Sequence, residues 1–155
     1  MALRTIVNGK DPILRKKSRP VTVFDSRLRI LLEDMAESMH SVAGAGLAAV
    51  QVGVLRRAVV IDVGEGVIEL INPVITKRSA ELVSASEGCL SFPREYGIVP
   101  RPKQVTVQAQ DRNGDPITIT GEDLLARAIC HETDHLDGVV FKDLATEVGI
   151  DEDEE

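Results

Sequence analysis

The sequence predicts an α+β fold, in which a helix near the N-terminus is followed by short strands and then by a second helix. An apolar stripe at helical spacing over residues 28–39 indicates the first helix. Short runs rich in β-branched residues, separated by turn signals, indicate strands between residues 58 and 120. A second apolar helix face begins at residue 124. We therefore expect short antiparallel strands together with two helices.

The length and composition indicate one domain. A chain of 155 residues with 43% apolar residues supplies a single hydrophobic core. Residues 151–155 are all acidic, and they leave 18 basic against 20 acidic residues in the rest of the chain. We expect one domain over residues 1–150. The acidic tail over residues 151–155 is predicted to be disordered, because its like charges repel and it has nothing to bury.

Composition also excludes several classes of partner. A nearly neutral body with no Trp, one Tyr and three Phe lacks the basic surface and the aromatic residues that nucleic-acid binding favours, so we expect no DNA partner. The apolar runs are far shorter than the roughly 20 residues that cross a bilayer, so we expect no membrane span. The N-terminus lacks a secretory signal, and two cysteines are too few for a disulfide framework. These features favour the bacterial cytoplasm.

The N-terminal third of the chain is predicted to form an arm and a helix. Residues 1–24 carry turn signals and little periodicity, so we expect an arm wrapped on the domain. Within it, the basic cluster Arg15–Arg19 is interpreted as solvated surface rather than a docking patch. Asp25 is the N-cap candidate of a helix of about 15 residues. Its apolar stripe consists of Leu28, Leu31, Leu32, Met35 and Met39.

The middle of the chain is predicted to be strands. Residues 58–63 and 67–75 are rich in β-branched residues, and a polar–apolar alternation follows through residues 82–83. Residues 104–110 and 117–120 alternate strictly. The dipeptide Asn113-Gly114 between them has the residues of a tight turn, so these two strands form the clearest hairpin in the chain.

A second helix is expected after this hairpin. Thr120 and Asp123 have the spacing of a capping box, and Gly138 is the candidate terminator. Residues 139–141, Val-Val-Phe, are predicted to form a short strand after the helix. The apolar side of the helix consists of Leu124, Leu125, Ala128 and Ile129.

The second helix carries the motif His131-Glu132-Thr133-Asp134-His135. Two histidines four residues apart on a helix project within about 40° of each other, so both imidazoles can bind one metal ion. A metal with an open position lowers the pKa of bound water, and an adjacent carboxylate can accept the proton and later donate it to a leaving amine. The motif therefore predicts a hydrolytic metal site with Glu132 beside it.

A third metal ligand is needed, and the residues alone leave two candidates. Glu147 is the only Glu after His135 outside the terminal acidic run, and it is close in sequence. Upstream, Cys89 lies in the turn-prone segment Glu87–Ser91, which a β-rich fold can bring beside the helix. A buried core position is an equally good interpretation of this cysteine on the local pattern alone.

The segment Gly44–Gln51 contains two glycines and several small residues. Its glycine spacing matches a dinucleotide-binding loop, but a helix pattern precedes it where that loop requires a strand. Small residues in an extended segment instead allow a peptide ligand to lie close to the backbone, with Gln51 available as an amide donor.

Taken together, the segments Gly44–Gln51, Glu87–Ser91 and His131–His135 resemble the three signature motifs of peptide deformylases, in order and at the usual separations. This resemblance implies a monomeric α+β enzyme with short antiparallel strands packed around a central metal-binding helix. It implies removal of the formyl group from the N-terminal formylmethionine of new proteins, with release of formate. The implied cofactor is Fe2+, which Zn2+ or Ni2+ can replace, and the implied partners are formylmethionyl nascent peptides.

The resemblance also implies residue roles. Cys89, His131 and His135 are the implied metal ligands, and Glu132 the general base and acid. The implied oxyanion donors are the Leu90 backbone N–H and the Gln51 amide, and an ion pair between Glu87 and Arg101 supports the metal loop. The implied substrate contacts are Gly46, Ala45, Leu124 and Ala128.

Three departures from the family pattern bear on function. Ala45 stands where the family usually has a β-branched residue and is expected to widen the side-chain pocket slightly. Cys130, before the first histidine, is interpreted as core. Some members dock on the ribosome through a C-terminal helix, where this chain has an acidic tail, so only a transient ribosome contact is expected. The alternatives are a small metallopeptidase that cleaves internal peptide bonds, and a metal-bearing binding module without catalysis.

Overall fold

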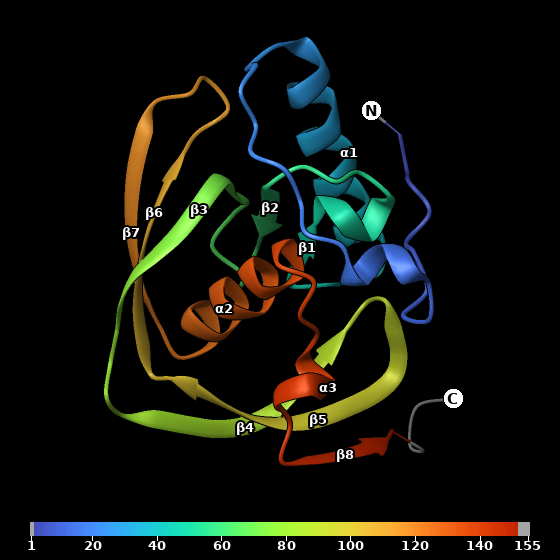
Figure 1. Cartoon of the computed structure of the whole chain (residues 1–155), viewed down its shortest axis with the longest axis vertical. Helices are drawn as coiled ribbons and strands as arrows, with labels where there is room; N and C mark the ends of the chain where they lie inside the picture. Colours follow the sequence, from blue (N-terminus) through green and yellow to red (C-terminus); the bar gives the residue numbers. More distant parts are fainter. Residues whose placement is uncertain (1, 152–155) are drawn as a thin grey trace.

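Two antiparallel sheets and a central helix make up the protein in a computed structural model, which describes residues 2–151. One sheet has the strand order β1-β2-β3-β6-β7 and the other the order β4-β5-β8. Figure 1 shows the helix α2 between these sheets and α1 at one end of the molecule. The α+β prediction is confirmed. The strands are β1 (Gly46–Ala48), β2 (Ala58–Ile61), β3 (Ile68–Arg78), β4 (Leu82–Cys89), β5 (Phe92–Pro102), β6 (Gln104–Gln110), β7 (Pro116–Glu122) and β8 (Glu147–Ile150).

The N-terminal residues form the arm that the sequence predicted. The arm contains one short 3-10 helix, η1 (Pro12–Arg15), and otherwise runs over the domain. The Val7 N–H donates to the Gln51 carbonyl at 2.7 Å, and the Gly9 N–H donates to the Ser91 carbonyl at 2.7 Å. The arm therefore contacts the backbone of two signature segments.

The first helix, α1 (Ser26–Ser41), agrees with the prediction. The Asp25 side chain accepts a hydrogen bond from the Leu28 N–H and caps the helix. Its apolar stripe is buried, and it packs with residues of β1 and β2 in one part of the core. This helix therefore covers the sheet on the side away from α2 (Figure 1).

The start of α2 (Leu124–Leu136) differs from the prediction. The expected capping box is absent, because β7 continues through Thr120 and the Thr120 hydroxyl contacts the Thr106 hydroxyl of β6 at 2.9 Å. Asp123 precedes the helix with a φ of 54° and makes no capping bond through its side chain. The end agrees, since Gly138 has a φ of 77° and donates its N–H to the His135 carbonyl.

The predicted hairpin is confirmed as β6 and β7, although residues 111–115 join the strands and the connection is longer than a two-residue turn. The strand predicted over residues 139–141 is wrong. Phe141 instead begins the short helix α3 (Phe141–Leu144), where the Asp143 carboxylate accepts a hydrogen bond from the Val140 N–H. The strand in this region is β8, which pairs with β5 and was not predicted.

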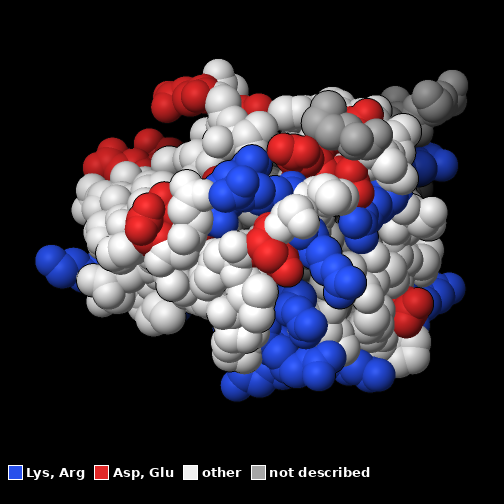
Figure 2. Space-filling model, turned by 90° about the horizontal axis from the view of Figure 1, so that it is seen from above, with Lys and Arg blue, Asp and Glu red and all other residues white. Residues whose placement is uncertain are grey.

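Basic and acidic side chains are unevenly spread over the surface. Figure 2 shows Lys and Arg gathered in a band on one face. In the predicted basic cluster, Arg15 forms an ion pair with Asp143 and so joins the arm to α3. The acidic tail was predicted to be disordered over residues 151–155, and residues 152–155 lie outside the described residues. Asp151 is described, and its N–H donates to the Arg94 carbonyl. None of the described helices is long and apolar enough to cross a membrane.

Candidate metal centre and active site

Three side chains with metal-binding atoms meet between α2 and the β4–β5 hairpin. The donor atoms of Cys89, His131 and His135 all lie within 4.8 Å of one another. The Cys89 Sγ is 3.3 Å from the His135 Nε2, and the two imidazole centroids are 5.0 Å apart. One thiolate and two imidazoles are a donor set that binds Fe2+, Zn2+ or Ni2+. Glu147, the other candidate ligand, lies exposed on β8.

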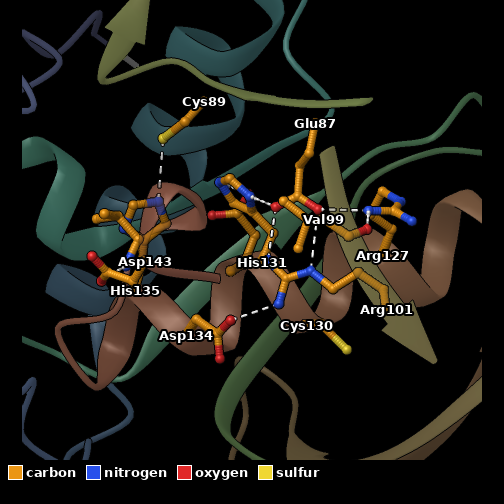
Figure 3. Close-up of polar contacts among 12 residues, drawn as sticks. Glu87, Cys89, Val99, Arg101, Arg127, Cys130, His131, Asp134, His135 and Asp143 are labelled. Atoms are coloured by element: carbon orange, nitrogen blue, oxygen red, sulfur yellow. Dashed lines mark hydrogen bonds and ion pairs between the residues drawn. The ribbon is translucent and has the colours of Figure 1, made fainter. Parts of the chain in front are cut away.

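The local structure explains how these ligands converge. His131 and His135 are one helical turn apart on α2, and both are buried. Glu87 and Cys89 are two residues apart on β4, so both side chains point from the strand toward α2 (Figure 3). The pairing of β4 with β5 shifts register between them, an irregularity of the kind that re-aims side chains beside sites.

Glu87 orients the first histidine. Its Oε2 lies 2.6 Å from the His131 Nδ1 and 2.7 Å from the Arg101 guanidinium, and its Oε1 accepts a second Arg101 bond at 3.1 Å. Burial by itself would raise the pKa of Glu87, but the bonds from His131 and Arg101 outweigh burial and lower the pKa to about 2. Glu87 is therefore a carboxylate that accepts the His131 Nδ1–H and leaves Nε2 for a metal.

Glu132 lies beside the three ligand atoms. Its carboxyl is buried, and Oε1 has no hydrogen-bond partner among the described residues. Burial raises the pKa of Glu132 to about 7, although the neighbouring His131 acts in the opposite direction. Gly46 of β1 faces this carboxylate so closely that a Cβ at this position would collide with it. A buried carboxyl with a pKa near neutrality can both accept and donate a proton at cellular pH.

Gln51 presents its amide nitrogen to the same place. Its Oε1 accepts a hydrogen bond from the Ala48 N–H at 3.0 Å, which defines the orientation of the amide. Its Nε2 lies 3.1 Å from the Ser91 hydroxyl and 3.5 Å from the Cys89 Sγ. The amide N–H groups therefore face the metal-binding atoms.

A cavity of about 680 Å³ opens beside this cluster. All four expected substrate contacts line it, as does Leu90. Ala128 is buried in its wall, whereas Leu124 is 56% exposed and lies at the rim. Arg94, Glu95 and Tyr96 from β5 also line the cavity, and none of them was assigned from the sequence.

Comparison with known proteins decides the family, because residues 3–149 match the family model for polypeptide deformylase. The chain belongs to the polypeptide deformylase family. Similar curated proteins are peptide deformylases from Acetivibrio thermocellus, 54% identical over 99% of this chain and 89% of that protein, and from Caldanaerobacter subterraneus, 57% identical over 92% and 89%. The crystal structure of the Thermotoga maritima peptide deformylase has a TM-score of 0.92 at 41% identity, covering 94% of this chain and 99% of that one.

Family membership confirms the implied activity. The protein is an enzyme of the deformylase family, a hydrolase that removes the N-terminal formyl group from newly made peptides. Such enzymes are metal-dependent, and this chain has a Cys-His-His cluster that can hold the metal. The match favours deformylation over cleavage of internal peptide bonds.

Sequence reasoning missed several residues of this deformylase site. Arg127 forms an ion pair with Glu87 at 3.0 Å, and Asp134 pairs with Arg101 at 2.7 Å. The Phe141 ring stacks on the His131 ring with centroids 6.1 Å apart. The signal for Arg127 was its position four residues before His131, on the same helical face. Cys130, interpreted as core, is buried in the main apolar cluster.

Proposed function

We propose that Cys89, His131 and His135 hold the catalytic metal, Fe2+ in the cell, and that Glu132 is the general base and then the general acid. The observation that carries this proposal is the meeting of these three donor atoms beside the buried Glu132 carboxyl, whose Oε1 has no hydrogen-bond partner among the described residues. When bound, a divalent metal supplies Lewis acidity that activates water and polarises a carbonyl group.

The histidines are prepared for this role in different ways. Burial and the neighbouring His131 lower the pKa of His135 to about 3, so this imidazole is neutral and available as a ligand. The Glu87 carboxylate holds the tautomer of His131, and Arg101 holds Glu87. Mutation of such supporting groups typically costs 10–100-fold in metal affinity or activity.

Proton transfer and oxyanion stabilisation fall to different residues. Glu132 would accept a proton from the attacking water and return it to the departing amine, which leaves formate as the other product. The Gln51 amide and the Leu90 backbone N–H would donate hydrogen bonds to the oxyanion that forms at the formyl carbon. Removal of one such donor costs roughly 3–4 kcal/mol in other hydrolases.

The cavity would bind the methionine side chain of the substrate. Ala45, Leu124 and Ala128 supply apolar lining, and the Gly46 backbone lies where an extended peptide can pair with it. Ala45 has less bulk than a β-branched residue, which favours a slightly wider pocket for the side chain.

The cellular setting is also proposed. A ferrous centre with a thiolate ligand is open to oxidation, so we expect the iron form to lose activity in air, whereas Zn2+ or Ni2+ forms persist. We propose a monomer in the bacterial cytoplasm with a single catalytic domain over residues 1–150, which meets nascent peptides through at most transient ribosome contact.

The test combines anaerobic metal analysis with formate release from a formyl-Met peptide, for the parent protein and for Glu132→Ala. We expect retained metal and activity reduced by several powers of ten, because the proton acceptor is lost. Glu147→Ala, which changes the exposed glutamate on β8, is the matched control and keeps parental activity. Near-parental turnover by Glu132→Ala would overturn the assigned role.

A further inference from the structure

Arg127 of α2 contacts both strands of the hairpin that carries Cys89. Its guanidinium donates to the Val83 carbonyl of β4 at 2.7 Å and to the Val99 carbonyl of β5 at 2.9 Å. A third bond reaches the Glu87 Oε1 at 3.0 Å. Figure 3 shows Arg127 beside Glu87 and Val99, on the same helix as His131. The side chain is 10% exposed, so these three protein acceptors take the place of water around its charge.

The proposed metal ligands come from two elements, β4 and α2, that are far apart in the sequence. Cys89 ends β4, whereas His131 and His135 lie on α2, about forty residues later in the chain. Their donor atoms meet only if α2 keeps one position along the hairpin. Arg127 is one helical turn before His131, so its bonds act on the segment of α2 that carries the ligands.

Arg101 makes a different set of contacts from Arg127. Its guanidinium bonds to Glu87 and to Asp134, and these contacts join β5 to side chains of β4 and α2. Arg127 adds bonds to main-chain carbonyls, which cannot change rotamer as a carboxylate can. Its rigid fork spans acceptors that a single ammonium group cannot reach together.

We propose that Arg127 is a positioning residue that sets α2 against the β4–β5 hairpin and so fixes the distance of Cys89 from His131 and His135. This inference rests on the proposed metal site. Arg127 acts through the backbone of both strands and through Glu87, and none of its three hydrogen bonds goes to a proposed ligand.

The test uses Co2+ as a spectroscopic probe of the anaerobically purified apo protein. Co2+ affinity is measured by competition with a chelator, and the thiolate-to-cobalt charge-transfer absorption reports the Cys89 ligand. For Arg127→Met we expect an affinity about 10–100-fold lower and a weakened or shifted absorption, because the ligands no longer converge.

Arg112→Met is the matched control. The Arg112 guanidinium also joins two elements, because it pairs with Glu69 of β3 at 2.6 Å and with Glu33 of α1 at 3.4 Å, but neither element carries a proposed metal ligand. We expect this variant to bind Co2+ like the parent. An equal loss of affinity in both variants would show that Arg127 contributes only general stability, and would overturn the proposal.

Arg127→Lys keeps the charge and provides a second variant if Arg127→Met does not fold. Because Lys lacks the fork, we expect it to recover only part of the affinity. Parental affinity and absorption in either Arg127 variant would overturn the positioning role while leaving the metal site intact. Failure of the parent protein itself to bind Co2+ with a thiolate band would instead overturn the proposed metal site.

Discussion

The two long helices of this deformylase differ in how they begin and in the kind of side chain that they bury. The N-terminal end of α1 is capped by the Asp25 side chain, and the helix buries an apolar stripe while its other face meets solvent. No side-chain cap bond starts α2, which is buried over most of its length. The buried polar residues of α2 are Arg127, His131, Glu132, Thr133 and His135.

This difference indicates that α1 contributes mainly to stability and α2 mainly to the chemistry of the site. Apolar burial stabilises the stripe of α1, and the two buried polar side chains of this helix, Asp34 and Ser38, bond to the N-terminal arm. The polar groups of α2 are tolerated in the interior because residues of β4 and β5 supply matching charges and acceptors. We therefore expect substitutions in α1 to lower the stability of the protein and substitutions in α2 to lower metal binding or turnover.

The largest effect is expected from His135→Ala in α2. Loss of one of three ligands should lower deformylase activity by at least about a thousandfold and remove the increase in melting temperature that added metal produces in the parent. Formate release and thermal unfolding with and without Zn2+ measure the two effects. A metal-dependent rise in melting temperature equal to that of the parent would contradict the ligand assignment.

In α1, Leu32→Ala tests the other side of the comparison. Leu32 is fully buried, so we expect the free energy of unfolding to fall by about 2–5 kcal/mol. Urea unfolding measures this loss. Activity per folded molecule should remain parental at low temperature. A loss of turnover without a loss of stability would contradict the assignment of α1 to stability rather than to chemistry.

A smaller effect on the free energy of unfolding is expected from substitutions at the N-terminal ends of the two helices. Asp25→Ala removes a capping bond and should lower the free energy of unfolding by about 1 kcal/mol. Asp123→Gly should lower it by little or even raise it, because Asp123 has a φ of 54° and makes no cap bond. Urea unfolding of both variants checks this, and equal losses would contradict the contrast.

The smallest expected effect concerns acid stability. The Ala2 N–H and the Arg4 side chain bond to the Asp34 carboxylate in α1 and lower its pKa. A lowered pKa stabilises the fold above the unfolded value, near 4, and this contribution is lost as the pH falls through the folded value. Asp34→Asn should therefore flatten the fall in stability on acidification. An unchanged slope below pH 5 would contradict this linkage.

Sequence patterns predicted the elements whose signals are local. The apolar stripe and cap of α1, the β6–β7 hairpin and the glycine that ends α2 all depend on neighbouring residues, and the structure contains each of them. The predictions of a capping box at Thr120 and of a strand over residues 139–141 were wrong. At Thr120 the hairpin pairing with β6 continues past the predicted cap, and at residues 139–141 the packing of Phe141 against β5 overrode the local preference.

By itself, the sequence determined the chemical types at the candidate site, because a thiol, two imidazoles and a carboxyl stand at the spacings of the deformylase motifs. The resemblance to deformylases had already indicated Cys89 as the third ligand, and the tertiary structure places its Sγ beside both histidines. Only the tertiary structure decided that Glu132 is buried and that Arg127 bonds α2 to the hairpin. The physical reason is that burial and long-range contacts arise only when β4, β5 and α2 come together. Desolvation and partners from other strands, not residue type, then set the protonation and position of each group.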